Sequence, residues 1–266
     1  SVLNVQHGDR VLSILPMHHT YECTCGFLLM LYIGATIAFC EGLKHISNNL
    51  KEVRPTVLLV VPLLLETMYK KVWATIEKKN MTKKVKFALG LTDFLKIFGI
   101  NLKKKLFKDI LEAFGGEIRY AIAGGAAIDP DVLKGLKRFG IVTIQGYGLT
   151  ESAPIAALNQ EHNNRDAAIG LPLPEVQLEI VNPDKDGIGE IKIKGPNVMM
   201  GYYEDPELTS TVLKDGWFYS GDIGYEDKDG FFYITGRKKN VIITKNGKNV
   251  FPEELETLIN LSPASK

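Results

Sequence analysis

The chain has 266 residues, of which 45% are hydrophobic and 24% charged, and its formal net charge at pH 7 is +1. This is the composition of a soluble globular chain that can bury one or two cores, and so small a net charge gives no reason to expect a nucleic-acid partner. Three cysteines, two of them in a Cys-x-Cys pair, exclude a disulfide framework, and no signal peptide opens the chain, so a cytoplasmic location is expected.

Apolar runs alternate with helical patterns over the first half of the chain. Buried strands are predicted at residues 11–15, 35–39, 56–61, 118–123 and 141–144, and helices at 21–32, 43–53, 63–78 and 130–139. The last helix has a clear start, because Asp129 is a good N-cap and Pro130 suits the first helical position. Strands separated by helices predict a largely parallel sheet, and such sheets bind ligands beyond the carboxyl ends of their strands.

The longest uncharged stretch, residues 23–40, has 18 residues and so reaches the length of a membrane span. Its glycines and polar residues argue against a span and favour a short buried helix, a turn at Gly34 and a buried strand. Potential metal ligands crowd together at its start. They are His18, His19, Glu22, Cys23 and Cys25. Their spacing matches no zinc pattern, so structural burial is favoured over a metal site.

Residues 77–108 carry ten lysines against Glu77 and Asp93, a local charge of +8. The segment also has an apolar centre at residues 87–100. Two interpretations stay open, namely a solvated pair of helices that the lysines keep soluble, and a surface that lies on anionic lipid.

The pattern changes from Gly170 onward, where prolines become frequent and the apolar runs become short and alternating. Antiparallel strands are predicted at residues 176–181, 188–194 and 231–235, joined by turns at 182–187 and 227–230. A further hairpin is predicted at 241–250 with Asn246 and Gly247 at its tip, and a helix is predicted to begin at Pro252. The predicted fold class is therefore α/β: a parallel-sheet α/β subdomain, a small antiparallel β-barrel, and the beginning of a small C-terminal α+β domain.

The stretch from Gln145 to Glu151 follows the predicted strand at 141–144 and combines several kinds of chemistry. Gly146 and Gly148 allow a close approach of the backbone to a ligand, and Tyr147 offers a flat apolar ring. Thr150 supplies a hydroxyl for a phosphate oxygen, and Glu151 supplies a carboxylate of the kind that holds Mg²⁺. An ordinary strand-end turn explains these residues equally well when they are taken alone.

Four motifs in a fixed order make the pattern specific. They are Gly124-Gly125-Ala126-Ala127, Gly146-Tyr147-Gly148-Leu149-Thr150-Glu151, Tyr219-Ser220-Gly221-Asp222 and Gly236-Arg237-Lys238-Lys239. Together they resemble the adenylate-forming (AMP-binding) superfamily, and most closely its long-chain fatty acid–CoA ligases, the acyl-CoA synthetases. The resemblance covers essentially the whole chain. It implies that a carboxylate attacks the α-phosphate of ATP to give acyl-AMP and pyrophosphate, and that CoA then displaces AMP, with ATP, Mg²⁺ and CoA as cofactor and co-substrates.

The resemblance also implies roles for the first two motifs. Gly124, Gly125 and Ala126 would line the adenine pocket, and Tyr147 would stack on the base within the nucleotide turn from Gln145 to Gly148. Thr150 would hydrogen-bond the α-phosphate, and Glu151 would hold Mg²⁺.

The downstream motifs receive roles in the same way. Asp222 would accept hydrogen bonds from both ribose hydroxyls, Arg237 would reach the ribose or a phosphate, and Ile234 would pack near the nucleotide. A turn aspartate and an exposed structural arginine are the alternatives. Lys239 would be the hinge for rotation of the C-terminal domain, unless it is simply a charged turn residue.

Two further positions match the family less specifically. Gly247 would approach the CoA tunnel, although Asn-Gly is also a common turn. His19 of Pro16-Met17-His18-His19-Thr20 would lie on the acyl side of the pocket, and a satisfied core histidine is the alternative.

The resemblance implies domains at residues 1–169 (α/β part of the large adenylation domain), 170–236 (β-barrel), 237–240 (hinge) and 241–266 (C-terminal domain). The chain begins without Met and carries no phosphate loop, which the family places upstream, and the family's C-terminal lysine lies beyond residue 266. The chain is therefore expected to be a piece of a larger protein and to be inactive, or nearly so, by itself. Its sheet is expected to have an exposed edge through which the piece self-associates. Aryl-CoA ligases, acyl-carrier-protein ligases and peptide-synthetase adenylation domains share the motifs, and a non-catalytic nucleotide- or acyl-binding module is an alternative of another class.

Overall fold

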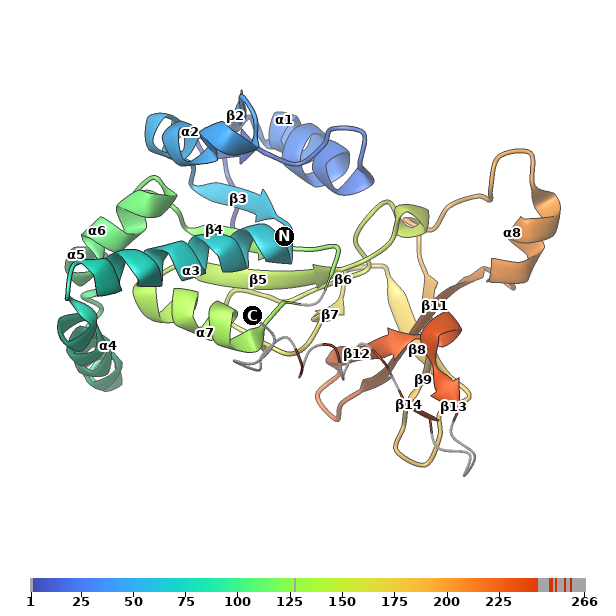
Figure 1. Cartoon of the computed structure of the whole chain (residues 1–266). Coiled ribbons are helices and arrows are strands. Elements are labelled where there is room, and N and C mark those ends of the chain that lie inside the picture. The colour runs from blue at the N-terminus through green and yellow to red at the C-terminus, as the bar shows by residue number, and fades with distance from the viewer. Residues whose placement is uncertain are drawn as a thin grey trace. The chain divides into compact units, whose positions relative to one another are not determined.

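A computed structural model describes residues 2–126, 128–243, 249–250, 252, 256 and 259. The chain folds into two compact units (Figure 1). The first unit consists of Ser1–Gly146 and Gln160–Asp166, and the second of Tyr147–Asn159 and Ala167–Lys266. The division therefore falls inside the Gln145 to Glu151 stretch, whereas the domain bounds implied by the resemblance remain a prediction.

The first unit contains a parallel sheet in the order β2-β1-β3-β4-β5. Its strands are β1 (Arg10–Ser13), β2 (Thr36–Phe39), β3 (Val57–Val60), β4 (Tyr120–Ala123) and β5 (Val142–Tyr147). Each corresponds to a predicted strand, and β3 and β4 are buried at every residue. Strands buried on both faces are typical of parallel sheets, because helices cover them. The predicted α/β part of the fold class is confirmed.

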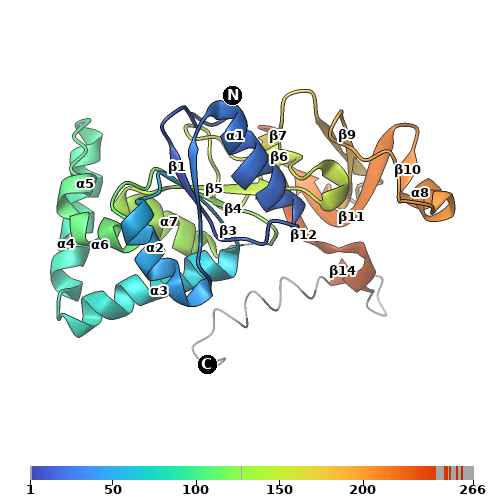
Figure 2. The same ribbon diagram turned by 90° about the horizontal axis from the view of Figure 1, so that it is seen from above.

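Helices surround these strands (Figures 1 and 2). They are the π-helix η1 (Glu22–Leu28), α1 (Leu29–Ile33), the 3-10 helix η2 (Leu43–His45), α2 (Ile46–Val53), α3 (Pro62–Lys78), α4 (Thr82–Ile97), α5 (Lys103–Leu106), α6 (Lys108–Leu111), the 3-10 helix η3 (Glu112–Phe114) and α7 (Pro130–Phe139). Helix α7 has the predicted bounds. The Asp129 carboxylate accepts a hydrogen bond of 2.8 Å from the backbone N–H of Asp131, which is an N-cap contact.

The prediction of a buried helix and a buried strand within residues 23–40 was wrong. In η1 and α1 only Glu22, Gly26 and Met30 are buried, and β2 is exposed at both of its ends. Because β2 is the outermost strand in the sheet order, it has a neighbour on one side only. Among the described residues no group of three or more His, Cys, Asp or Glu side chains is placed to hold a metal ion.

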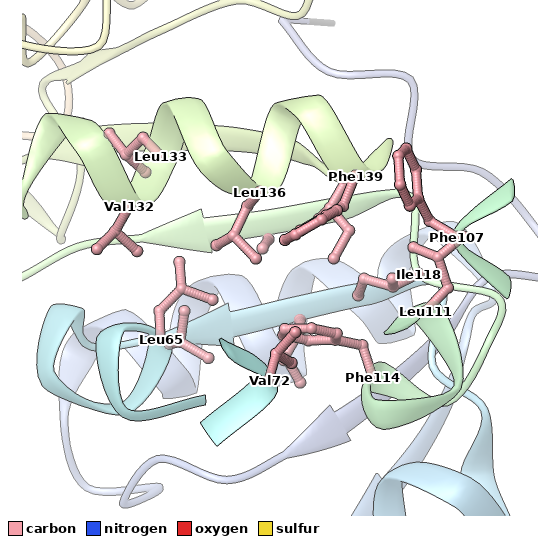
Figure 3. Close-up of a cluster of buried hydrophobic side chains, with 14 of the residues drawn as sticks. Leu65, Val72, Phe107, Leu111, Phe114, Ile118, Val132, Leu133, Leu136 and Phe139 are labelled. Carbon is pink, nitrogen blue, oxygen red and sulfur yellow. The ribbon is translucent and has the colours of Figure 1, made fainter. Parts of the chain in front are cut away.

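The core of the first unit lies between the sheet and helices α3, α6 and α7. Figure 3 shows Leu65 and Val72 of α3 facing Val132 and Leu136 of α7. At one end of this core the rings of Phe107 and Phe139 meet edge to face, with centroids 5.3 Å apart. Aromatic pairs in this arrangement add to the stabilisation that comes from burial alone.

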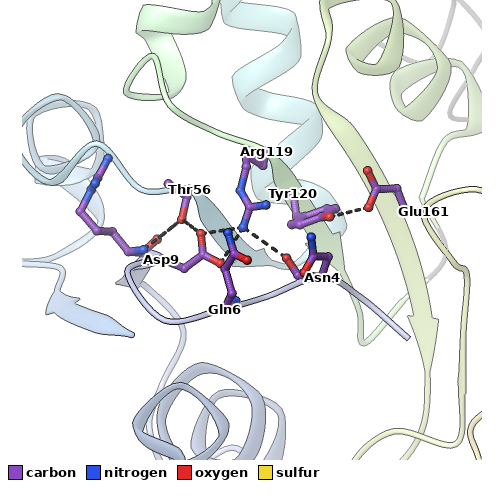
Figure 4. Close-up of polar contacts among 8 residues, drawn as sticks. Asn4, Gln6, Asp9, Thr56, Arg119, Tyr120 and Glu161 are labelled. Atoms are coloured by element: carbon purple, nitrogen blue, oxygen red, sulfur yellow. Dashed lines mark hydrogen bonds and ion pairs between the residues drawn. The ribbon is translucent and has the colours of Figure 1, made fainter. Parts of the chain in front are cut away.

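A polar network lies at the amino ends of β1, β3 and β4 (Figure 4). The buried Asp9 carboxylate accepts hydrogen bonds of 2.6 Å from Arg119 and from the Thr56 hydroxyl, and one of 2.8 Å from the backbone N–H of Gln6. Burial alone would raise the pKa of Asp9, but these hydrogen bonds and the Arg119 charge together lower it. Asp9 therefore stays ionised and joins three segments of the first unit.

The second unit contains a curled antiparallel sheet in the order β10-β11-β9-β8, with β12 paired to β11. Its strands are β8 (Gln177–Val181), β9 (Gly189–Lys194), β10 (Leu213–Lys214), β11 (Trp217–Glu226) and β12 (Phe232–Arg237), and the short strands β6 (Ala157–Leu158) and β7 (Leu171–Pro172) pair with each other. The predicted antiparallel part of the fold is confirmed. Sequence patterns missed the ten-residue strand β11 and helix α8 (Pro206–Val212).

The end of the chain is described in part. Strand β13 (Ile242–Ile243) pairs antiparallel with β14 (Asn249–Val250), as the predicted hairpin requires. The tip with Gly247, most of the helix predicted from Pro252, and Ala127 of the first motif lie outside the described residues. In the described part of the chain, no helix is both long enough and apolar enough to cross a membrane.

Candidate functional site

Gly124, Gly125 and Ala126 follow the carboxyl end of β4 in the first unit. Gly125 has a φ of +87°, which favours glycine, and a Cβ built there would meet no atom of the described residues within 4 Å. Behind this turn lies Tyr21, whose ring would be 3.3 Å from a Cβ at position 124 and whose hydroxyl donates to the Ile122 carbonyl at 3.0 Å. The turn therefore presents backbone on its open side and is supported by Tyr21 on the other.

Gln145 and Gly146 lie at the carboxyl end of the neighbouring strand. Gln145 is the register partner of Ala123 across the β4–β5 pair, so the two turns leave the same edge of the sheet. Parallel sheets bind ligands at this edge. That Gly124 to Ala126 and Gln145 and Gly146 bind a nucleotide remains a prediction. The Gln145 side chain is buried, and its role in binding remains a prediction.

His19 lies in a different setting from a core histidine. It is exposed, and its ring lies against that of His18 in a tilted arrangement, with centroids 4.6 Å apart. One turn later, Glu22 is fully buried, and it accepts a hydrogen bond of 2.5 Å from the Ser13 hydroxyl. Its second oxygen has no hydrogen-bond partner among the described residues. Burial raises the pKa of Glu22, which the Ser13 hydrogen bond offsets in part.

Tyr147 begins the second unit and belongs to its hydrophobic core. Its hydroxyl donates a hydrogen bond of 2.7 Å to Oδ2 of Asp222. Burial is the main reason that the pKa of Tyr147 lies well above its usual value, so the phenol keeps its proton. The ring is thus fixed at both ends, as a stacking platform requires, although stacking on a base remains a prediction.

Asp222 lies on β11 directly opposite Arg237 on β12, in an antiparallel register. Arg237 Nε is 2.8 Å from Oδ1 of Asp222. The Asp222 backbone N–H donates to the Ser220 hydroxyl oxygen at 3.1 Å, and that hydroxyl donates to the Ile191 carbonyl at 2.6 Å. Burial raises the pKa of Asp222, although Tyr147 and Arg237 partly offset this effect. The structure therefore brings together three of the predicted nucleotide-binding residues.

An irregularity in the ladder produces this pairing. Gly224 pairs with Ile234, but the next residue, Ile223, pairs with Gly236, so Thr235 is an extra residue on β12. The Thr235 hydroxyl donates to the Ile223 carbonyl at 3.2 Å. This is the pattern of a β-bulge, in which two residues of one strand oppose one residue of its partner.

Thr150 and Glu151 open the 3-10 helix η4 (Thr150–Ser152). Gly148, just before it, must be glycine, because an added Cβ would lie 1.8 Å from the Pro154 carbonyl oxygen. The Thr150 side chain is exposed. Glu151 is half-buried, and its Oε1 accepts a hydrogen bond of 2.9 Å from the Tyr202 hydroxyl.

Three residues of the loop between β9 and α8 hold this turn, and sequence reasoning missed them. Tyr202 contacts Glu151 as described, and the Met199 backbone N–H donates to the Glu151 carbonyl at 2.8 Å. The Asn197 side-chain amide donates to the carbonyls of Ser152 and Ile155, both at 3.0 Å. No motif, regular spacing or cluster of charges in the sequence distinguishes these three residues from other loop residues, so the sequence alone gave no signal for their role.

Ile234 and Lys239 stand apart from these contacts. Ile234 is exposed on β12, and Lys239 is exposed in the 3-10 helix η5 (Lys238–Asn240). The neighbouring Lys238 instead forms an ion pair of 2.8 Å with Glu190. The nucleotide contact of Ile234 and the hinge role of Lys239 remain predictions.

Comparisons with known proteins agree with these observations. Residues 1–203 match the family described as AMP-binding enzyme. The chain is 31% identical to fatty acyl-CoA synthetase A of Dictyostelium discoideum, over 96% of this chain and 41% of that protein. It is 30% identical to human long-chain-fatty-acid–CoA ligase 1, over 97% of this chain and 39% of that protein. The chain thus spans about two fifths of the length of these relatives.

Solved structures show the same fold. A fatty acyl-CoA synthetase of Mycobacterium tuberculosis aligns with a TM-score of 0.68 and 26% identity, over 98% of this chain and 46% of that chain. An O-succinylbenzoate-CoA synthetase of Bacillus subtilis in complex with AMP aligns with a TM-score of 0.74 at 22% identity, over 98% of this chain and 47% of that chain. The family match over most of the chain, together with the arrangement around Asp222, shows that the chain belongs to the AMP-binding enzyme family.

Proposed function

We propose that the full-length protein carrying this chain activates a fatty acid with ATP, first to acyl-AMP and pyrophosphate and then, with CoA, to acyl-CoA and AMP. The observation that carries the proposal is the buried Asp222 carboxylate between Tyr147 and Arg237. The names of the relatives described above support a fatty acid as the substrate, because they are fatty acyl-CoA synthetases.

Asp222 fits a ribose diol well. A carboxylate can accept hydrogen bonds from two neighbouring hydroxyls at once, and burial strengthens such contacts. Tyr147 and Arg237 each contact a different oxygen of Asp222, so they fix the plane of the carboxylate before a nucleotide arrives. Arg237, exposed and permanently charged, can turn from Asp222 toward a phosphate or the ribose.

The phosphate end of the nucleotide would be served by Thr150 and Glu151. Attack on an α-phosphate needs in-line positioning and neutralised charge rather than a protein nucleophile. The exposed Thr150 hydroxyl can donate to a phosphate oxygen. Glu151 fits Mg²⁺, because a carboxylate oxygen is a ligand that this ion prefers, and Tyr202 holds the side chain through Oε1 alone. Bound Mg²⁺ would neutralise phosphate charge, and the protein's own task is to orient Glu151.

The deciding experiment is ATP–pyrophosphate exchange by the full-length protein with carboxylates of graded chain length and with benzoates. Exchange that rises with chain length supports fatty acid activation. A preference for benzoates would instead indicate an aryl-CoA ligase, and transfer to a carrier protein in place of CoA would indicate an acyl-carrier-protein ligase or a peptide-synthetase adenylation domain.

A catalytically silent nucleotide- or acyl-binding module is the alternative of another class. Absence of exchange with every carboxylate, together with measurable AMP binding, would favour it. The geometry of Glu151 argues against it, because a module that only binds a nucleoside has no need of a metal carboxylate held in place by Tyr202.

We also propose that the lysine-rich segment contacts anionic membranes through the outward face of α4, defined as Phe87, Leu91 and Phe94 of the helix together with its C-cap residue, Phe98. These residues recur every three or four positions and are between 39% and 74% exposed, while Val85, Leu89 and Thr92 on the opposite side are buried. An exposed apolar stripe flanked by lysines is the pattern of a helix that lies in a membrane interface.

Co-sedimentation with vesicles of anionic and of zwitterionic lipid tests this contact. The triple variant Lys103→Glu, Lys104→Glu, Lys105→Glu should weaken binding to anionic vesicles, and adding Phe94→Ser to it should weaken binding further. Unchanged binding of the triple variant would refute the membrane contact and leave the solvated-helix interpretation. Oligomer formation remains a prediction that the same preparation can test by light scattering.

A further inference from the structure

A cavity of about 370 Å³ opens in the first unit between helices α2, α3, α4 and α6. Its wall is largely apolar and includes Ile46, Val72, Ile76, Val85, Ile110 and Phe114. Each of these side chains is part of the hydrophobic core of this unit or packs against it. The cavity is within the size range of small-molecule sites, roughly 300–1,000 Å³.

This cavity lies at the opposite end of the sheet from the nucleotide turns. Helix α3 begins at Pro62, just after the carboxyl end of β3, and only its later residues, from Met68 onward, reach the cavity. Phe114, on the far wall, is six residues before the start of β4 at Tyr120. In Figure 1, α4, α5 and α6 accordingly gather where β3, β4 and β5 begin. The cavity is therefore separate from the turns at Gly124 and Gln145.

Lysines surround the mouth of this cavity. Lys51 of α2, Lys71 of α3 and Lys84 of α4 line it, together with Lys79 just after α3, and all four are exposed. Among the described residues that line the cavity, Asp109 is the one carboxylate. Within the described part of the chain none of the four lysines forms an ion pair, and Lys71 contacts only the Ser47 hydroxyl, at 3.3 Å. The cavity thus has an apolar interior and a cationic mouth.

We propose that this cavity is a second binding site, for an anionic alkyl chain such as a fatty acid carboxylate, distinct from the site where the acid is activated. The apolar interior fits the chain, and the lysines fit the carboxylate, because surplus positive charge at the mouth attracts an anion. Helix α4 supplies Val85 and Ala88 to the cavity on one side and the outward face of α4 on the other. A chain bound there would pack against the inner side of α4.

The experiment is photo-crosslinking of the full-length protein, without ATP, to dodecanoate that carries an alkyl diazirine, followed by peptide mapping. Crosslinks are expected on α3, α4 and α6 within residues 68–79, 84–88 and 107–114. Unlabelled octanoate, decanoate and dodecanoate should compete with increasing strength, by about fourfold for each methylene that enters the cavity.

Three variants make the test specific. Ala88→Trp fills the cavity and should abolish these crosslinks. Lys79→Glu with Lys84→Glu reverses two charges at the mouth and should weaken labelling about tenfold. The matched control is Lys78→Glu with Lys86→Glu, which changes two exposed neighbours that do not line the cavity and should leave labelling unchanged.

Crosslinks confined to other segments, or an equal loss in the two double variants, would overturn the proposal. If Ala88→Trp fails to fold, as judged by circular dichroism, the exposed lysine pair still decides the question. The site does not depend on the proposed reaction. Crosslinks in the cavity of a protein without ATP–pyrophosphate exchange would refute fatty acid activation and leave this site standing.

Discussion

Two buried aspartates, one in each unit, pair with arginine and yet differ in character. Asp9 and Asp222 are each 4% exposed. Asp9 accepts hydrogen bonds from a guanidinium, a hydroxyl and a backbone N–H, and its pKa is lowered. Asp222 accepts them from one phenol and one guanidinium, and its pKa is raised. The number of donors, rather than the presence of arginine, decides which carboxylate is fully satisfied and which has capacity left for a ligand.

The arginines differ in the same direction. The Arg119 side chain is 28% exposed and contacts both oxygens of Asp9, whereas the Arg237 side chain is 57% exposed and contacts one oxygen of Asp222. A pair with one exposed partner is easily opened by a competing ligand. We therefore interpret the Asp9 pair as structural and the Asp222 pair as part of a binding site. Three predictions test this contrast, and a fourth tests the orientation of Glu151.

The largest effect is expected for Asp9→Ala. Removing one member of a buried ion pair leaves Arg119 without its partner, and we expect a loss of about 3 kcal/mol in the free energy of unfolding. Urea unfolding of the full-length protein measures it. The control is Glu117→Ala, which breaks an exposed pair with Arg54 and should cost less than about 0.5 kcal/mol. Equal losses in the two variants would remove the structural role of Asp9.

A smaller effect is expected for Asp222→Asn, and on a different quantity. Asparagine keeps an acceptor for Tyr147 but loses the charge, so AMP affinity should fall about tenfold or more, which is about 1.4 kcal/mol. Calorimetry with AMP measures it. Asp184→Asn, in an exposed turn of the same unit, is the matched control. If AMP binds equally to the Asp222→Asn protein and the parent, the ribose assignment is wrong.

The two aspartates should also make the free energy of unfolding change with pH in opposite directions. The folded-state pKa of Asp9 lies below its ordinary value of 3.8, so its stabilisation is present above pH 3.8 and is lost as the pH falls through the folded-state value. The folded-state pKa of Asp222 lies above 3.8, so its contribution is present below pH 3.8 and is lost as the pH rises through the folded-state value.

The measurement compares unfolding free energies of the Asp9→Asn and Asp222→Asn proteins with those of the parent between pH 2 and pH 7. The difference for Asp9 should develop below pH 3.8 and that for Asp222 above it, and the two differences should have opposite signs. The pKa of Glu22 is also raised. Its contribution cancels when the unfolding free energy of the parent is subtracted from that of each variant. Slopes of the same sign would contradict the contrast between the two sites.

The smallest effect is expected for Tyr202→Phe. It removes one hydrogen bond to a half-buried carboxylate, which is worth about 0.5–1 kcal/mol. The Mg²⁺ concentration that half-saturates ATP–pyrophosphate exchange should therefore rise by about threefold, with little change in thermal stability. Tyr203→Phe alters the exposed neighbouring tyrosine and serves as the control. No difference between the two variants would show that Tyr202 does not orient Glu151.

The sequence predicts well those features that nearby residues determine. Helix α7 begins and ends where Asp129, Pro130 and Gly140 direct it, because capping and left-handed turns depend on a few adjacent residues. The positions of the glycine turns after β4 and β5 follow in the same way from alternating apolar runs and punctuating glycines.

Contacts between distant segments could not be predicted in this way. The Tyr202–Glu151 and Tyr147–Asp222 hydrogen bonds join residues 51 and 75 positions apart. The family resemblance implied that Asp222 binds the ribose and that Arg237 binds the ribose or a phosphate, but it gave no reason for the two residues to bind each other. The exposure of α1 and β2 was missed for a related reason, since a continuous apolar run does not reveal whether its strand lies inside the sheet or at its edge.

The extra residue in β12 has a consequence for how the nucleotide site is encoded. If the ladder continued beyond Gly224 in the register of the hairpin end, Gly236 would lie opposite Asp222, and the carboxylate would have no cation across the strand. The Asp222–Arg237 contact thus requires both a basic residue at position 237 and the extra residue in β12. A deletion or insertion of one residue between the β11–β12 turn and Arg237 leaves every motif residue unchanged. It should nevertheless alter nucleotide affinity as much as replacement of Arg237 itself.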